Sequence, residues 1–317
     1  MSRKVPEVKK YLFGPVPSRR LGLSLGVDIV PFKVCTLDCV YCQLGKTTEK
    51  TIERRYSVPV EDVLSELKER LTCGLKADFI TISGSGEPTL NIKLGEVIKG
   101  IKKITRIPVA ILTNGTLFDD KKVRAECALA DVVLPSLDAG NEQSFQRINR
   151  PCKGLSIEKL VSGLCSFRDE FSGQIWLEVF IIEGFNTNIE QIGLIRGLIE
   201  RIRPDKVQLN MAVRPVAEKC IRSIEFEKLQ TIAVQLGNRC EVIADYPYIP
   251  ADKNVKGKAE YVLSLLNRRP CCLDDICSGL GIHRNEALKH LSCLQRQGII
   301  YTEEKGGKTF YAVRLRK

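Results

Sequence analysis

The sequence has no apolar stretch that approaches the ~20 residues a membrane-spanning helix needs. Its first ten residues, MSRKVPEVKK, lack the apolar centre of a secretory signal peptide. Of the 317 residues, 44% are hydrophobic and 27% are charged, as in soluble globular proteins. These features predict a cytoplasmic protein without a membrane segment, long enough for one large domain and a small one.

Histidine is also scarce, because the chain contains only His283 and His290. Both lie in its C-terminal part, so imidazole acid–base catalysis is not expected in a domain that precedes them. Cysteine, by contrast, is abundant. The thirteen cysteines are an odd number scattered through the chain, which fits a reducing compartment better than a disulfide framework.

Three of the cysteines lie in the short segment VCTLDCVYCQL. Cys35, Cys39 and Cys42 have the spacing C-x3-C-x2-C, and Tyr41 directly precedes the third. Three thiolates at this spacing can bind three corners of one iron–sulfur cube and leave one iron open, whereas a self-contained cluster takes four cysteines. A structural zinc site is less suitable, since no second C-x2-C or C-x2-H pair follows. Asp38 and the absence of helix or strand periodicity favour a loop over buried apolar cysteines.

This segment resembles the signature of the radical S-adenosylmethionine (SAM) superfamily. The resemblance implies a [4Fe-4S] cluster on Cys35, Cys39 and Cys42, whose open iron is chelated by the amino and carboxylate groups of SAM. It also implies that an electron from the cluster breaks a carbon–sulfur bond of SAM, and that the 5′-deoxyadenosyl radical abstracts a substrate hydrogen. The electron would come from an external flavodoxin- or ferredoxin-like donor.

Strand-like and helix-like segments alternate after the cysteines. Short apolar runs predict strands at residues 26–31, 79–83, 109–113, 132–137, 175–182 and 207–210. Apolar residues at helical spacing predict helices at residues 59–71, 94–104, from 119, 157–167, 189–202 and 224–236. Six strand–helix units predict an α/β fold, an open (βα)6 partial TIM barrel over residues 1–253, as the resemblance also implies. Ligands of such folds gather at the carboxyl ends of the strands.

The second strand ends in the glycine-rich sequence SGSGEPT. Gly84 and Gly86 allow a backbone to approach a ligand closely, and Glu87 supplies a carboxylate for a cationic group. The stretch resembles the Gly-Gly-Glu element of the superfamily, which binds the amino group of SAM. Ser85 stands here in place of the first of its two adjacent glycines.

Polar residues also end or interrupt the next strands. Asn114 follows the third strand, and Ser136 and Asp138 end the fourth. The resemblance implies that such side chains hydrogen-bond the ribose or carboxylate of SAM, although Asn114 and Asp138 can instead cap the next turn or helix. Glu178 interrupts the apolar fifth strand, so we expect it to point into the barrel, with SAM or a buried cation as its partner.

Four further residues are candidates for substrate contacts. Arg19 and Arg20 lie in the glycine- and proline-rich segment 13–28, which is expected to be a loop. They can bind an anionic group in the cavity or form an exposed charge pair. Asn210 and Arg214, at the end of the sixth strand, can contact adenine or substrate, or serve as ordinary loop residues.

The pattern changes at residue 254. Helices at 259–266, 273–280 and 284–297, a turn at 281–282 and strands at 299–303 and 309–313 resemble a winged helix-turn-helix domain over residues 254–317. The chain carries a net charge of +11, of which +6 comes from 13 basic and 7 acidic residues after residue 250. The third helix would present Arg284, Asn285, Lys289 and His290 to phosphates and base edges, although winged helices also bind peptides.

These features favour a radical SAM enzyme that acts on a nucleic-acid base or a nucleobase-like substrate. GPVPSRR and SGSGEPTLN resemble the tRNA wyosine-base synthases, but those enzymes carry further N-terminal cysteines for a second cluster, and none precedes Cys35. Wyosine synthesis itself is therefore not favoured. A peptide- or protein-modifying radical SAM enzyme is the alternative, and an iron–sulfur transcription regulator is the alternative outside enzymes. The SAM-binding elements argue against the regulator.

Overall fold

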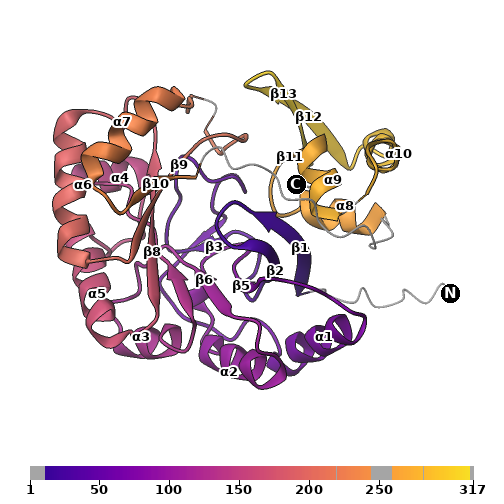
Figure 1. Cartoon of the computed structure of the whole chain (residues 1–317), viewed down its shortest axis with the longest axis horizontal. Coiled ribbons are helices and arrows are strands. Elements are labelled where there is room, and N and C mark those ends of the chain that lie inside the picture. The colour runs from indigo at the N-terminus through magenta and orange to yellow at the C-terminus, as the bar shows by residue number, and fades with distance from the viewer. Residues whose placement is uncertain (1–10, 219, 244–258, 281, 315–317) are drawn as a thin grey trace.

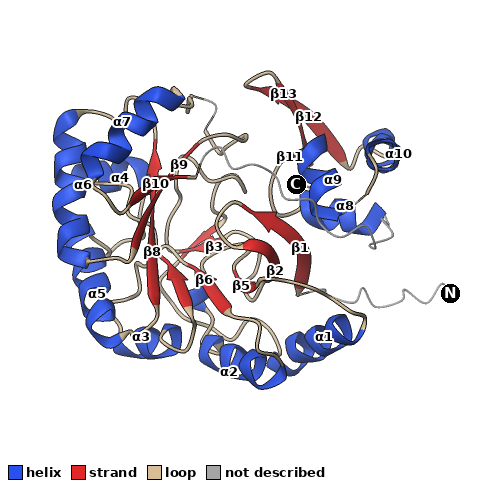
Figure 2. Cartoon of the chain, in the orientation of Figure 1, coloured by secondary structure: helices blue, strands red, loops and turns tan. Residues whose placement is uncertain are grey.

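The computed structural model describes residues 11–218, 220–243, 259–280 and 282–314. They form an α/β partial barrel and a smaller C-terminal module (Figures 1 and 2). The barrel sheet has the strand order β1-β2-β5-β6-β7-β8-β9-β10. Its strands are β1 (Leu12–Ser18), β2 (Gly22–Val27), β5 (Phe79–Ile82), β6 (Val109–Leu112), β7 (Val132–Leu134), β8 (Gln174–Ile181), β9 (Lys206–Met211) and β10 (Cys240–Val242).

The helices of the barrel lie outside the sheet (Figure 1). They are α1 (Val60–Thr72), α2 (Leu94–Ile104), α3 (Lys121–Cys127), α4 (Glu142–Asn149), α5 (Ile157–Glu170), α6 (Ile189–Ile202) and α7 (Phe226–Leu236), with a short 3-10 helix at Pro88–Leu90. Their apolar stripes are buried against the sheet, as Val97, Ile98 and Ile101 of α2 illustrate with 0% exposure. Within the described residues, no helix is both long and apolar enough to cross a membrane.

The predicted parallel sheet is confirmed. Strands β2, β5, β6, β7, β8 and β9 pair in parallel in sequence order, and each is followed by at least one helix. The cysteine loop lies between β2 and its helix α1. Parallel pairing places the carboxyl ends of the six strands at one rim. The elements that were not predicted include α4 and the short strand β10, which extends the sheet beside β9.

The prediction for the first strand was wrong in position. The strand spans Gly22–Val27 instead of residues 26–31, and the expected loop at 13–28 is an antiparallel β1–β2 hairpin. The strand ends early because the carboxylate of Asp28 accepts a hydrogen bond from the backbone of Val30, 3.3 Å away, and turns the chain. Prolines obscured β1 in the sequence, but an edge strand tolerates them.

The C-terminal module is a winged helix-turn-helix, as predicted. It contains α8 (Ala259–Leu266), β11 (Cys271–Cys272), α9 (Leu273–Leu280), α10 (Arg284–Arg296), β12 (Ile300–Lys305) and β13 (Lys308–Val313). Its three strands are antiparallel in the order β11-β13-β12, and it has its own apolar core. The predicted boundary at 253/254 and residue 281 of the predicted turn lie outside the described residues.

The module packs against the β1 edge of the barrel (Figure 1). Val16 of β1 contacts the apolar core of the module. Two ion pairs cross the junction: Arg268 pairs with Asp28, and Arg214 Nη2 lies 3.1 Å from Asp275 Oδ1 of α9. The winged helix is therefore attached next to the carboxyl end of β2, where the cysteine loop begins.

Candidate cluster and cofactor site

The cysteine loop begins seven residues after β2 ends, with Cys35 on the short strand β3 (Val34–Cys35), which pairs with β4 (Glu49–Lys50). The amides of Asp38 and Val40 donate hydrogen bonds of 3.0 Å to the last residues of α4. The loop is thus fixed on both sides by backbone contacts. Helix α4 thus holds one side of the loop, and sequence periodicity did not reveal it because only two of its residues, Phe145 and Ile148, are apolar.

Burial, and then the charges of Asp138, Cys35 and Cys42, raise the pKa of Cys39, so the three thiols lie within one another's electrostatic range. Among the described residues, no three His, Cys, Asp or Glu side chains are grouped tightly enough to hold a single metal ion. A cube binds each thiolate to a different iron, so its cysteines need not converge on one point. The arrangement therefore suits a cluster better than a mononuclear zinc site.

Each sulfur of the three motif cysteines has at least one N–H donor. Asn114 Nδ2 lies 3.6 Å from Cys35 Sγ, and Asn149 Nδ2 lies 3.4 Å from Cys39 Sγ. The ammonium of Lys33 donates to Cys42 Sγ at 3.3 Å. Such donors stabilise negative charge on sulfur and adjust the reduction potential of a bound cluster. Lys33 and Asn149 were not identified from the sequence.

Burial raises the pKa of the Cys35 and Cys39 thiols, which favours their protonated forms in the chain alone. Desolvation and the charge of Glu87 raise the pKa of Cys35 to about 12, and desolvation raises that of Cys39 well above its usual value. Iron must therefore displace protons from buried thiols as it binds.

The SGSGE loop after β5 packs directly on the cysteine loop. A Cβ added to Gly86 would lie 2.0 Å from the carbonyl oxygen of Val34, the residue before Cys35. The amide of Glu87 donates to the same oxygen at 3.1 Å, and the amide of Lys33 donates to Ser85 O at 2.7 Å. Only glycine permits this approach at position 86. The two segments therefore form one structural unit.

Gly84 and Ser85 complete this loop. Gly84 has a φ of 137°, and an added Cβ would lie 2.5 Å from Asp28 Cγ. The hydroxyl of Ser85 donates to Asp28 Oδ2 at 2.6 Å and accepts from Arg268 Nη1 at 2.7 Å. The substitution of serine for the expected glycine thus links the loop to the C-terminal module, a contact that no local sequence pattern indicates.

Glu87 is 2% exposed and receives four hydrogen bonds. Its Oε1 accepts from the amide and hydroxyl of Thr89, at 3.0 and 2.7 Å, and from the hydroxyl of Thr113 at 2.6 Å. Its Oε2 accepts from the amide of Asn114 at 2.8 Å. Burial raises the pKa of Glu87, and these hydrogen bonds oppose the rise. The carboxylate therefore joins the ends of β5 and β6.

Asn114 and Ser136 differ in how fully they are engaged. Asn114 Oδ1 accepts from the amide and hydroxyl of Thr116 at 3.0 and 2.7 Å, and its Nδ2 donates to Thr36 Oγ1 at 2.7 Å. This is the turn-capping role that was the alternative for Asn114, combined with its contact to Cys35. The half-buried hydroxyl of Ser136 makes no hydrogen bond within the described part of the chain, so it is free to bind a ligand.

Asp138 fixes the aromatic residue of the cysteine motif. It is 2% exposed and accepts hydrogen bonds from the hydroxyl of Tyr41, from Asn149 Nδ2 at 2.8 Å and from the amide of Phe180 at 2.9 Å. Burial raises its pKa to about 6, against these hydrogen bonds. The ring of Tyr41 stacks on Phe180 with centroids 4.1 Å apart. Asp138 thus positions the residue before Cys42.

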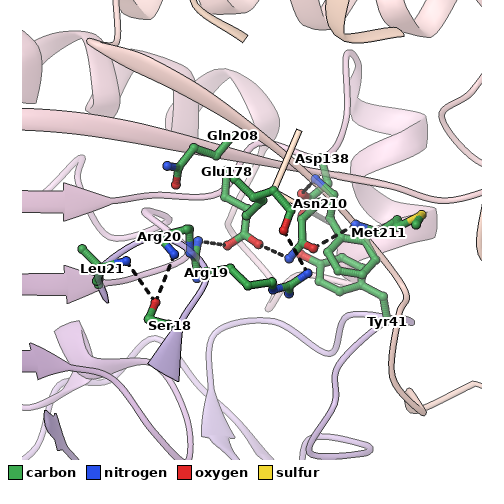
Figure 3. Close-up of polar contacts among 12 residues, drawn as sticks. Ser18, Arg19, Arg20, Leu21, Tyr41, Asp138, Glu178, Gln208, Asn210 and Met211 are labelled. Atoms are coloured by element: carbon green, nitrogen blue, oxygen red, sulfur yellow. Dashed lines mark hydrogen bonds and ion pairs between the residues drawn. The ribbon is translucent and has the colours of Figure 1, made fainter. Parts of the chain in front are cut away.

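Glu178 points into the barrel, where Arg20 and Asn210 converge on it (Figure 3). Arg20 Nη1 lies 2.7 Å from Glu178 Oε2, and Asn210 Nδ2 donates to Oε1 at 2.7 Å. Burial alone would raise the pKa of Glu178, but the charge of Arg20 and the two hydrogen bonds lower it. Of the two partners expected for Glu178, SAM or a buried cation, the structure shows a cation, the guanidinium group of Arg20. Arg19, beside Arg20, donates to Ile243 O at 3.2 Å and is not exposed.

On the winged helix, Arg284, Asn285 and Lys289 are exposed along α10, and His290 is half-buried. Arg284 is 3.1 Å from Asp274. His283 serves a structural role, because its Nδ1 accepts from the amide of Asn285 at 3.2 Å and caps α10. The exposed basic side chains are available to an anionic partner.

Comparison with known proteins agrees with this architecture. The family model described as "Radical SAM superfamily" matches residues 29–192, which is 164 of the 317 residues. The model described as "Bacterial regulatory protein, arsR family" matches residues 260–302. A radical SAM methyltransferase from Sphaerobacter thermophilus has the same fold over 69% of this chain and 65% of its own, with a TM-score of 0.52 and 16% identity.

Two curated relatives match almost the whole chain. A UPF0026 protein of Helicobacter pylori is 33% identical over 315 residues, covering 98% of this chain and 99% of the relative. The GTPase Obg of Brachyspira hyodysenteriae is 37% identical over 313 residues, covering 96% of this chain but only 45% of that protein. The chain therefore belongs to the radical SAM superfamily, whose cofactors are a [4Fe-4S] cluster and SAM, and within it to the UPF0026 proteins.

Proposed function

We propose that this chain is an enzyme that binds a [4Fe-4S] cluster through Cys35, Cys39 and Cys42 and acts on a nucleobase-bearing substrate. When bound, the cluster and SAM would supply radical chemistry that removes a hydrogen atom from the substrate. The observation that carries the proposal is the packing of the SGSGE loop on the residue before Cys35, combined with an N–H donor at each cysteine sulfur.

In this proposal, Gly84, Ser85, Gly86 and Glu87 hold the amino end of SAM beside the cluster. Glu87 mainly orients the SGSGE loop, because its carboxylate oxygens accept hydrogen bonds from Thr113 and Asn114 that join the ends of β5 and β6. The hydroxyl of Ser136 has no other partner among the described residues and can accept or donate to the ribose or carboxylate.

Two more of the proposed cofactor-binding side chains act by position. Asn114 lies between the proposed SAM site and Cys35. Asp138 accepts a hydrogen bond from the hydroxyl of Tyr41 and so fixes the residue directly before Cys42. Glu178, held by Arg20 and Asn210, lies in the barrel interior, where it contributes a fixed negative charge.

The nucleobase assignment is supported by the C-terminal module. The module matches the arsR family model, and the exposed basic residues of α10 are of the types that contact nucleic acids. The GTPase named among the relatives is not carried over to this chain, since the match covers less than half of that protein. An external flavodoxin- or ferredoxin-like donor would supply the electron, and such donors favour a cytoplasmic location.

The test is anaerobic reconstitution of the full chain with iron and sulfide, followed by measurement of 5′-deoxyadenosine with SAM and a reductant. Cys35→Ser should lose both cluster and product. Cys73→Ser is the matched control, because Cys73 is exposed at the end of α1, and it should behave like the wild type. A fully loaded cluster that releases no 5′-deoxyadenosine would contradict the enzyme assignment. Product formation that rises with peptide pools but not with RNA, DNA or nucleotides would replace the nucleobase with a peptide.

A further inference from the structure

A cleft of about 690 Å³ lies where the winged helix meets the barrel. Sites that hold small molecules typically have volumes of about 300–1,000 Å³, so the cleft is large enough for a nucleotide. One wall is formed by β12 and the turn after it, residues 301–306. The other wall belongs to the segment after β9, with residues 215, 216, 218 and 221–223.

The barrel wall of the cleft is attached to the cysteine loop. The amide of Ala217 donates to the carbonyl oxygen of Cys42 at 2.8 Å, and the amide of Glu218 donates to that of Val40 at 3.1 Å. Val216, which lines the cleft, packs in the same apolar cluster as Val40. A ligand in the cleft would therefore be separated from the cysteine loop by a single backbone segment.

The wing wall presents alternate residues of β12 to the barrel. Residues two apart in a strand share a face, so Tyr301, Glu303 and Lys305 point the same way. Lys305 Nζ donates to the carbonyl oxygen of Arg214 at 2.9 Å, which turns this face toward the barrel (Figure 1). Burial and the charge of Glu303 raise the pKa of Tyr301, as expected for neighbours on one face. The ring and the carboxylate therefore lie together in the cleft.

Three of the five charged groups that line the cleft are engaged within the protein. Glu218 Oε1 accepts from Arg150 Nη1 at 2.7 Å, and Glu304 accepts from the hydroxyl of Thr309. Lys305 is bound to the barrel as described above. These groups are therefore not the ones that a ligand would meet first.

The other two charged groups are available. The carboxylate of Glu303 is half-buried and makes no hydrogen bond or ion pair within the described part of the chain. Arg222, on the opposite wall, is exposed and has no such partner there either. Since a partly buried carboxylate without a partner is unfavourable, a ligand with N–H donors would be favoured at Glu303. The guanidinium of Arg222 can bind an anionic group of the same ligand.

A nucleotide combines the groups that this cleft would recognise. Tyr301 is 38% exposed, and bases stack on aromatic rings of this kind. Adenine, cytosine and guanine carry an exocyclic amino group that can donate to a carboxylate, whereas uracil has carbonyl oxygens that a carboxylate repels. The phosphate would then lie toward the exposed Arg222.

We propose that the cleft binds a nucleotide of the substrate whose base carries an amino group, with the base at Tyr301 and Glu303 and the phosphate at Arg222. This rests on the proposed function and narrows its substrate class. Because Tyr301 and Glu303 belong to β12, the winged helix contributes directly to the substrate site.

The test measures nucleotide binding to the full, cluster-reconstituted chain by calorimetry, without SAM or reductant. At least one of AMP, CMP and GMP should bind about tenfold more tightly than UMP, as one hydrogen bond to a charged group provides. Glu303→Gln should remove this preference, because a glutamine amide can donate to uracil as well as accept from an amino group. Glu61→Gln, at an exposed position of α1, is the matched control and should keep the preference.

The other two side chains have their own variants. Tyr301→Leu should weaken binding of the preferred nucleotide about tenfold, whereas Tyr301→Phe keeps the ring and should bind like the wild type. Arg222→Gln should weaken binding of the nucleotide but not of the corresponding nucleoside. A hexanucleotide of the preferred base, compared with a uridine hexanucleotide, distinguishes a nucleic-acid strand from a free nucleotide as the source of the ligand.

The proposal is supported if the preference for an amino-bearing base appears with mononucleotides or with hexanucleotides. Its absence from both would overturn the proposal, and so would binding by Tyr301→Leu or a preference in Glu303→Gln equal to that of the wild type. Circular dichroism checks that each variant is folded. Because none of these measurements needs SAM cleavage, failure of the cleft is distinguishable from failure of the enzyme assignment.

Discussion

Replacing Gly86 by alanine should separate the SGSGE loop from the cysteine loop. The added Cβ would lie 2.0 Å from Val34 O, whereas ordinary contact begins at 3.4 Å, so the two backbones must move apart by 1.4 Å (3.4 − 2.0). Neither side can yield by rotating a side chain, because the atom in contact belongs to the backbone. The strain therefore acts on the segment that carries Cys35.

The movement also breaks specific hydrogen bonds. Glu87 N to Val34 O, at 3.1 Å, and Lys33 N to Ser85 O, at 2.7 Å, both cross this junction. If the loops stay packed, overpacking should lower the free energy of unfolding by about 1–3 kcal/mol. If they separate, the two hydrogen bonds are lost at about 1 kcal/mol each, and the cysteines lose their arrangement.

Either outcome is measurable. Urea unfolding followed by circular dichroism gives the stability of the chain, and iron content per chain after reconstitution gives the occupancy of the cluster site. Gly193→Ala is the matched control: Gly193 lies in α6, nothing lies within 4 Å of its added Cβ, and alanine should stabilise the helix by up to about 1 kcal/mol. Gly86→Ala protein with wild-type stability and a full complement of iron would refute the reasoning.

Three further predictions concern neighbouring groups. Lys33→Met should lower the reduction potential of the bound cluster, because the ammonium 3.3 Å from Cys42 Sγ stabilises the added electron; an unchanged potential in a redox titration would count against this. Asp138 has its pKa raised from 3.8 to about 6, so its contribution to stability is complete below pH 3.8 and is lost as pH rises to about 6. Relative to Asp138→Asn, wild-type stability should thus fall across that interval by up to about 3 kcal/mol, and parallel pH profiles would exclude it. Lys289→Gln, on the exposed face of α10, should weaken any nucleic-acid binding and reduce its salt slope by about 1, with Lys99→Gln on the barrel as the control.

The sequence was most informative where a local pattern repeats. Five of the six predicted parallel strands begin or end within about two residues of the observed strands. The same agreement holds for the helices predicted at 94–104, 189–202 and 273–280. The positions agree because the apolar pattern of these segments reflects their burial in the fold. The first strand was misplaced because Asp28 turns the chain after Val27 and because the prolines of its hairpin partner β1 are typical of a loop. Helix α4 was missed because Phe145 and Ile148 are its only apolar residues, too few to show a helical period.

At the candidate site, the residue types were predictable but their partners were not. The glycines of SGSGE indicated a close approach, yet no sequence pattern states that the approached atom is the carbonyl of Val34. Asn149 contacts the sulfur of Cys39 because it lies at the end of α4. Lys33 contacts the sulfur of Cys42, and its own backbone has a φ of 62°. Such contacts depend on tertiary structure, so single-sequence reasoning does not reach them.

The junction between the modules extends to the loop proposed to hold SAM. Arg268, which follows α8 of the winged helix, donates to the hydroxyl of Ser85 and pairs with Asp28. A displacement of the module would break both contacts and leave the hydroxyl of Ser85 with its hydrogen bond to Asp28. The docked position of the module should therefore favour the arrangement of Ser85 and Asp28 at the ends of β5 and β2. In this arrangement, the position of the winged helix would act directly on the proposed SAM site.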